Sequence, residues 1–184
     1  IACGLIKSIE TIPVNSSIEC EVYMPYGVNL WPSFWLTACD DWPPEIDIFE
    51  GYTDEKGSYE DKLKLHWKFP FLYRDIRMES NVHYKNPKHE QIGPKGDHKS
   101  FFKLPLHLNL NHFKCEWRED SIKFYINGKL HRIVTNKKVL NNMKTKGMWV
   151  IFNVFVNKEF NLSENGDINK FYTGMVIKNF KVTK

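Results

Sequence analysis

Three carboxylates lie close together in one short segment of the chain, at Glu45, Asp47 and Glu50. The apolar residues between them indicate a β-strand, on which side chains two positions apart share a face. Glu45 and Asp47 then share a face, whereas strict alternation would send Glu50 to the opposite one. The adjacent apolar pair Ile48 and Phe49 predicts a β-bulge, which inserts one residue and resets the alternation. We therefore expect all three carboxylates on one surface.

Crowded carboxylates repel one another, so at least one of them should hold its proton more tightly than usual. A glycosidase uses such a pair, because it needs one ionised carboxylate beside one protonated carboxylic acid. From spacing alone, two other interpretations stay open. One is a solvated acidic face on an ordinary strand. The other is a calcium site, since calcium prefers oxygen ligands, although the strand setting and the missing glycine turn do not fit an EF-hand loop.

The rest of the chain has the size and composition of one folded domain. It has 184 residues, of which 42% are apolar and 15% aromatic, and this composition excludes a disordered or collagen-like chain. No apolar run approaches the roughly 20 residues of a membrane-spanning helix. The net charge of +4 hides an asymmetry, because residues 1–60 carry −9 and the remainder +13. The three carboxylates belong to the acidic part.

Short strands joined by polar turns predict an all-β fold. The Asn127-Gly128 pair between two strand-like runs is a strong signal for a hairpin. Residues 137–144 could form one short helical turn. Many short strands without a long amphipathic helix indicate a sandwich or a barrel. The expected strands cover residues 17–24, 113–117, 122–126, 129–134, 148–156 and 175–182.

The four cysteines do not indicate a metal site. Cys3, Cys20, Cys39 and Cys115 are widely spaced, and no two of them form a C-x-x-C pair. One disulfide and four buried thiols both remain possible readings of this spacing, with buried thiols favoured.

Two motifs together resemble glycoside hydrolase family 16, in its laminarinase, agarase, carrageenase, porphyranase and endo-galactosidase branch. Residues 31–36 (WPSFWL) resemble the strand that precedes the catalytic motif, and residues 45–50 (EIDIFE) resemble the bulged E-x-D-x-x-E motif itself. Residues 120–129 and 149–154 resemble later strands, so the resemblance covers most of the chain. It implies a concanavalin-like β-jelly roll of two curved antiparallel sheets with a concave substrate cleft. We expect residues 1–184 to form a single catalytic domain whose N-terminal strands are lacking or shortened.

The resemblance also implies a function, that of a retaining, endo-acting hydrolase of a β-linked glucan or galactan. Glu45 would be the nucleophile, Glu50 the acid and later the base, and Asp47 would lie between them and hydrogen-bond the nucleophile. No cofactor is required, although a structural calcium ion is compatible with this family. We further expect a monomer that is secreted or lies at the cell surface or in the periplasm.

Polysaccharide clefts carry aromatic side chains, because the apolar faces of sugar rings stack on them. By position relative to the carboxylate motif, Trp35, Trp42 and Phe155 are the candidates, and a core aromatic is the alternative for each. Asn153 resembles a position that binds sugar hydroxyls. His83 resembles a position facing the cleft from the next strand, with a structural histidine as the alternative.

The basic remainder bears on the choice of substrate. Residues 61–103 hold ten Lys or Arg against five carboxylates, and Arg74 and Arg77 are expected in loops at the edge of the cleft. Arginine suits bidentate binding of sulfate or carboxylate groups, so an anionic glycan is one hypothesis and an ordinary solvated surface the other. The alternative function is a catalytically inactive carbohydrate-binding domain. Nucleic acid is not expected as a partner, because an acidic strand at the centre of the cleft would repel phosphate.

Overall fold

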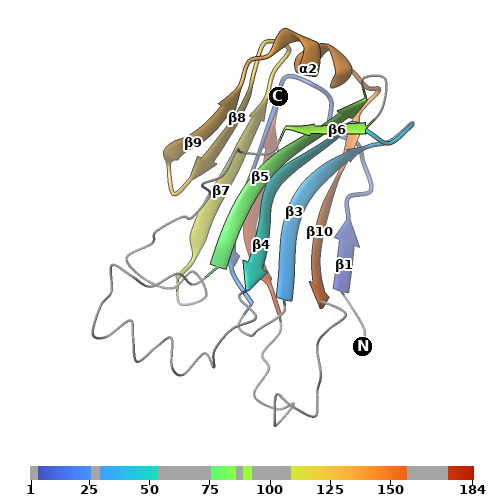
Figure 1. Ribbon diagram of the computed structural model, residues 1–184. Helices are drawn as coiled ribbons and strands as arrows, with labels where there is room; N and C mark the ends of the chain where they lie inside the picture. Colours follow the sequence, from blue (N-terminus) through green and yellow to red (C-terminus); the bar gives the residue numbers. More distant parts are fainter. Residues whose placement is uncertain (1–3, 26–29, 54–75, 86–88, 93–108, 157–173) are drawn as a thin grey trace.

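The part of the chain that the structure describes is a sandwich of two antiparallel β-sheets, a jelly roll, with one short helix (Figure 1). The computed structural model describes residues 4–25, 30–53, 76–85, 89–92, 109–156 and 174–184. Within these ranges no helix is long and apolar enough to cross a membrane. The all-β architecture expected from the sequence is confirmed.

The first sheet has six strands in the order β1-β10-β3-β4-β5-β6. Each neighbouring pair is antiparallel, and β4, the strand with the three carboxylates, lies between β3 and β5. The strands curve together across the molecule (Figure 1). Their bounds are β1 Gly4–Lys7, β3 Leu30–Ala38, β4 Glu45–Thr53, β5 Ile76–Lys85, β6 His89–Ile92 and β10 Met148–Val156.

The second sheet has five strands in the order β11-β2-β7-β8-β9. The strands expected from alternation at residues 122–126, 129–134 and 148–156 have the predicted bounds, and the others differ by one or two residues at an end. The bounds are β2 Ser16–Tyr23, β7 Asn111–Trp117, β8 Ile122–Ile126, β9 Lys129–Val134 and β11 Val176–Thr183.

Alternation along the strands places apolar side chains between the two sheets. Phe34 and Phe152 stack at a centroid distance of 4.4 Å on neighbouring strands of the first sheet. Phe49 lies 4.5 Å from Phe113 of the second sheet, so the rings join the two layers. Trp117 is 1% exposed and belongs to this core. Because the core packs against one face of β4, the side chains on its other face point away from the second sheet.

The predicted hairpin and helix both form. Asn127 and Gly128 have φ angles of 49° and 76°, as a two-residue turn with the twist of a hairpin requires. Asn127 Oδ1 also accepts a 2.8 Å hydrogen bond from the backbone N–H of His112. Helix α2 covers Lys137–Asn142, and the side chain of Asn136 caps its N-terminus.

The described cysteines are free thiols. Cys20 and Cys115 are buried in the core and Cys39 is partly exposed. Burial raises the pKa of the Cys20 thiol to about 12, and it raises the pKa of the Cys115 thiol further. The prediction of buried thiols is confirmed for Cys20 and Cys115 and is wrong for Cys39, and Cys3 lies outside the described residues.

Candidate active site

A β-bulge in β4 brings the three carboxylates to one face. On β3, Phe34 pairs with Phe49 and Trp35 with Asp47, so Ile48 is the extra residue without a partner. The register with β5 shifts in the same place, between Asp47 and Glu50. Both bulged residues are buried, at 4% exposure for Ile48 and 1% for Phe49. The bulge predicted from the adjacent apolar pair is confirmed.

Strand register now defines the surface that carries the carboxylates. Residues that pair directly across antiparallel strands share a face. We call the face of the six-stranded sheet that turns away from the five-stranded sheet the open face. Three cross-strand rows on it contain the carboxylates: Trp149, Thr37, Glu45 and His83; Ile151, Trp35, Asp47 and Asn81; and Asn153, Ser33, Glu50 and Glu79.

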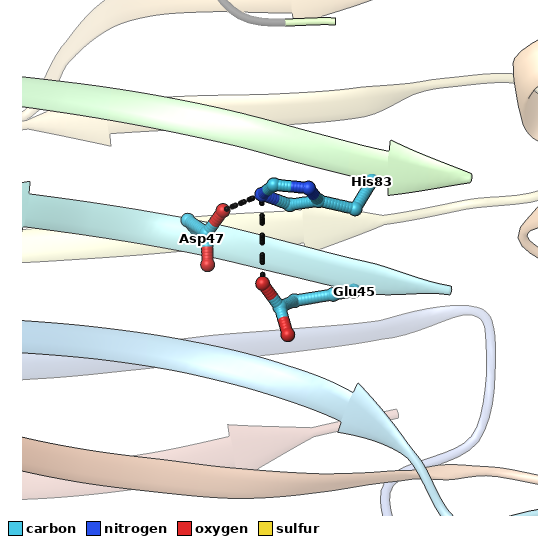
Figure 2. Close-up of side chains that lie close together, drawn as sticks. All are labelled: Glu45, Asp47 and His83. Carbon is cyan, nitrogen blue, oxygen red and sulfur yellow. Dashed lines mark ion pairs between the residues drawn. The ribbon is translucent and has the colours of Figure 1, made fainter. Parts of the chain in front are cut away.

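Glu45, Asp47 and His83 form the centre of this face (Figure 2). The Nε2 atom of His83 lies 3.1 Å from Oδ2 of Asp47 and 3.5 Å from Oε1 of Glu45. Little of this group is exposed, with side-chain exposures of 14% for His83, 15% for Glu45 and 4% for Asp47. The histidine therefore lies against both carboxylates.

Burial and mutual repulsion raise the proton affinity of the carboxylates. The pKa of Glu45 rises from 4.5 to about 7, because the side chain is desolvated and the charge of Asp47 is close. A hydrogen bond from Trp42 and the charge of His83 act in the opposite direction. The pKa of Asp47 is raised well above its ordinary value by burial and by the charge of Glu50. The site can thus hold a proton near neutral pH.

Asp47 is the most buried of the three carboxylates. Its hydrogen bond with Glu45 and the positive charge of Arg132 lower the pKa and offset part of the effect of burial. Its Oδ2 atom contacts His83 but has no partner with hydrogen-bond geometry among the described residues. The protonation of Asp47 therefore depends on that of Glu45.

Trp42 contacts the centre of the site, and Trp35 pairs with Asp47 on the neighbouring strand. Trp42 is half exposed, and its Nε1 donates a 2.8 Å hydrogen bond to Oε2 of Glu45. Trp35 Nε1 donates a 2.6 Å hydrogen bond to Oδ1 of Asn153 on the neighbouring strand. Asn153 is 2% exposed, and its Nδ2 has no hydrogen-bond partner among the described residues. That amide group is thus a buried donor beside Trp35.

Phe155 lies farther from the carboxylates than the other predicted residues. It pairs with Trp31 in the row beyond Asn153, at the end of β10. The two rings make an edge-to-face contact at 6.3 Å, and both are about 40% exposed. Trp31 and Phe155 thus form an exposed aromatic pair at this end of the open face. Phe155 was predicted as a candidate from the sequence, and Trp31 was not.

Two further polar residues on the open face were not predicted. Asn81 donates a hydrogen bond from Nδ2 to Oε2 of Glu50 and is 2% exposed. Glu79 pairs directly with Glu50 across the strands. Strand alternation back from His83 is the sequence signal that could have found both, because residues 79, 81 and 83 share a face.

The basic residues expected at the edge of the cleft are only partly described. Arg77 lies within β5, where it pairs with Tyr52, and not in a loop as expected. The strand continues through this position because β4 extends to Thr53. Arg74 lies outside the described residues.

One group of side chains at the site offers metal-ligating atoms. Ligand atoms from Glu45, Asp47 and His83 all lie within 4.8 Å of one another. A histidine nitrogen beside two carboxylates suits a transition ion better than calcium, which prefers oxygen ligands only. This group therefore does not fit the structural calcium ion expected from the resemblance, which stays a prediction.

Several solved structures of polysaccharide-degrading enzymes have this fold. β-Agarase A from Zobellia galactanivorans superposes with a TM-score of 0.66 at 20% identity, over 98% of this chain and 67% of that one. The endo-β-1,3-glucanase from Pyrococcus furiosus gives a TM-score of 0.63 at 22% identity, over 97% of this chain and 65% of that one. This chain therefore spans about two thirds of the length of these enzymes.

The sequence itself matches in two further comparisons. A galactan endo-β-1,3-galactanase from Flammulina velutipes is 43% identical over 53 residues, which make up 27% of this chain and 21% of the fungal protein. A family model for glycosyl hydrolases family 16 matches residues 2–173, which is nearly the whole chain. The bulged carboxylate strand, the jelly roll and this match agree, and the chain belongs to glycosyl hydrolases family 16.

Proposed function

We propose that the protein is a retaining, endo-acting glycoside hydrolase that cleaves a β-linked polysaccharide by double displacement. The observation that carries this proposal is the bulge at Ile48, which turns Glu45, Asp47 and Glu50 to the open face. A binding protein has no use for three mutually repelling carboxylates at one place, whereas a glycosidase needs them. Membership of the family supports the same reaction class.

In the first step Glu45 attacks the anomeric carbon while Glu50 donates a proton to the leaving oxygen. The glycosidic bond breaks as the bond to Glu45 forms, which gives a covalent glycosyl-enzyme and releases the shortened chain. In the second step Glu50 removes a proton from water, and the water oxygen displaces Glu45 at the same carbon. Two inversions give net retention of configuration.

The neighbours of Glu45 have matching roles. Trp42 and His83 both favour the ionised form of Glu45, which is the form that attacks. Asp47 accepts or shares the proton that Glu45 must lose, so the pair keeps one charge instead of two. This chemistry requires no metal ion.

The substrate is proposed as a β-glucan or a β-galactan. Glucanases, an agarase and a galactanase are all among the similar proteins. The open face presents carboxylates at its centre, which disfavours a negatively charged group in the sugar that binds there. An anionic substrate stays a prediction that rests on the Lys and Arg residues of the 61–103 segment, and such groups would have to bind away from the centre. We further propose a monomer that acts outside the cytoplasm.

Reducing-end release from a polysaccharide panel tests the proposal. The panel holds laminarin, mixed-linkage glucan, agar, porphyran, carrageenan and β-1,3-galactan, and NMR of the first product gives the anomeric configuration. We expect β-configured product from at least one polysaccharide, and a loss of at least about 10³-fold in Glu45→Ser and Glu50→Ala. Binding without release by the wild-type protein would indicate an inactive carbohydrate-binding domain instead.

A further inference from the structure

A partly buried arginine from the second sheet contacts the strand opposite the bulge. Arg132 lies on β9 and pairs directly with Phe124, which is a core residue, so its side chain points between the sheets. Its guanidinium lies over the ring of Phe124 at 5.7 Å. Arg132 Nη1 donates a hydrogen bond to the backbone carbonyl of Ser80 on β5 and lies 3.3 Å from Ser80 Oγ. The contact joins the two sheets.

Ser80 is the residue of β5 that faces the bulge. Asp47 pairs with Asn81 and Glu50 pairs with Glu79, so Ser80 is the single residue opposite Ile48 and Phe49. A bulge disrupts the backbone ladder at this point. Ser80 is 1% exposed, and an unsatisfied carbonyl at such a site would cost free energy. The guanidinium supplies a donor where the bulge perturbs the regular ladder.

The charge of Arg132 also acts on the carboxylates. It lowers the pKa of Asp47, and Asp47 in turn raises the pKa of Arg132 against the effect of burial. The charged and titratable residues of β4 and β5 whose side chains the structure describes are Glu45, Asp47, Glu50, Glu79, His83, Tyr84 and Lys85. Asp47 is the one whose charge acts on Arg132, so the cation behind the strand offsets part of the charge of Asp47.

We propose that Arg132 is a positioning residue for the carboxylates of the open face, which holds the bulge in register through Ser80 and offsets their charge from inside the core. The inference rests on the proposed function, because its consequence is the correct placement of Glu50 for acid catalysis. Glu50 reaches the open face only through the bulge. Loosening of the bulge would therefore misplace the acid while the binding surface on β3 and β10 stays intact.

Two substitutions separate the hydrogen bonds from the charge. In Arg132→Met both are lost and the aliphatic stem is kept. We expect kcat to fall by about 10- to 100-fold with little change in KM, since small displacements of a catalytic group have effects of this size. The acid limb of kcat/KM should move to higher pH, because the cation that favours a negative charge on the linked Glu45 and Asp47 pair is gone. In Arg132→Lys the positive charge remains but the guanidinium is lost. We therefore expect the acid limb of kcat/KM to stay at the wild-type pH, and kcat to fall by a smaller factor than in Arg132→Met.

Arg118→Met is the matched control. Arg118 also donates to a strand residue, with Nη2 at 2.9 Å from Ser17 Oγ, but it follows β7 and its described side-chain bonds are to residues of the second sheet. We expect this variant to lose stability with unchanged kcat and an unchanged pH profile. If Arg132→Met behaves in the same way, its role is structural and the inference is overturned.

A readout that needs no activity keeps the test independent of the proposed function. Backbone hydrogen exchange over residues 46–50 should become faster in Arg132→Met and remain as in the wild type in Arg118→Met. Unchanged exchange in Arg132→Met would contradict the inference even in a protein that hydrolyses nothing. Should Arg132→Met fail to fold, Arg132→Lys decides, since wild-type values of both kcat and exchange in that variant would overturn the proposal. A wild-type protein without hydrolysis would instead count against the proposed function.

Discussion

The indole Nε1 of Trp42 donates a 2.8 Å hydrogen bond to Oε2 of Glu45, the carboxylate three residues farther along the chain. The bond stabilises the ionised form of Glu45 against the effects of burial and of Asp47. The residue that was expected to stack on sugar thus also acts on the proposed nucleophile.

Removal of this donor should change the pH dependence of hydrolysis. With Glu45 at a pKa of about 7, we expect the acid limb of kcat/KM near pH 7 in the wild type and not near the ordinary carboxyl value of 4.5. Trp42→Phe loses the hydrogen bond that lowers this pKa, so its limb should lie at higher pH. Trp31→Phe is the control, because the described ring contact of Trp31 is with Phe155, and its limb should not move. Identical profiles for Trp42→Phe and the wild type would contradict this assignment.

The raised pKa of Glu45 should also appear in the stability of the protein. A carboxyl whose pKa is higher in the folded state does not lower the free energy of unfolding below pH 4.5. As the pH rises from 4.5 to about 7, that free energy falls, because the unfolded state ionises more readily than the folded state. Glu45→Gln removes this penalty. Thermal unfolding should show Glu45→Gln more stable than the wild type by about 1–3 kcal/mol at pH 8, with a much smaller difference at pH 4. Glu119→Gln on the exposed turn after β7 is the control. An equal gain at both pH values would refute the explanation.

Asn81 should matter for protonation of the leaving group. Its amide donates a hydrogen bond to Glu50, and bonds to charged groups contribute about 1.5–3 kcal/mol. Asn81→Ala should therefore reduce kcat on polysaccharide by about 10- to 100-fold. An aryl glycoside with a dinitrophenolate leaving group needs little acid catalysis, so its hydrolysis should fall much less. Asn142→Ala at the end of α2 serves as the control, and a uniform loss on both substrates would assign Asn81 to binding or folding.

Asn153 and Trp35 should act together in substrate binding. Trp35 fixes the amide through Oδ1, and Nδ2 is left as a buried donor. We expect Asn153→Ala to raise KM by about tenfold, consistent with one lost hydrogen bond. Trp35→Phe should raise KM too, and the double variant should cost less than the two separate effects combined. Strictly additive free energies in this cycle would show that the two residues act independently.

The hairpin at Asn127 offers a prediction about stability alone. Asn127 has a φ of 49° and its side chain bonds to the backbone of His112. Asn127→Ala keeps the turn but loses this bond and places alanine in the left-handed region, at a cost of about 1–2 kcal/mol. Chemical denaturation should show this loss with kcat unchanged. Asn127→Gly should recover part of it, and a glycine variant weaker than the alanine variant would exclude strain as a cause.

The three carboxylates could be placed from the sequence because strand alternation is a local property. Two side chains on one strand share a face whatever the rest of the chain does, so Glu45 and Asp47 could be placed at once. The adjacent apolar pair Ile48 and Phe49 then predicted the bulge that places Glu50. The strand bounds followed for the same reason, and so did the turn at Asn127 and Gly128.

The contacts between strands could not be predicted in the same way. Asn81 reaches Glu50 and Arg132 reaches Ser80 only because of register and of the packing of the two sheets, and a single sequence contains no direct signal for either. Arg77 was assigned to a loop because the pairing that extends β5 is likewise non-local. The bridge from His83 to both Glu45 and Asp47 was expected only as a position facing the cleft.

The bulge at Ile48 has a consequence at the level of the gene. Loss of the single codon for Ile48 would leave the spacing E-x-D-x-E, in which simple alternation again places every carboxylate on the same side of the strand. A three-nucleotide deletion could therefore convert one spacing of the motif into the other without inverting Glu50, whereas loss of the codon for Ile46 would invert Glu45 relative to the other two. Between Glu45 and Glu50, a single-residue deletion therefore keeps the three carboxylates on one face only at the bulge.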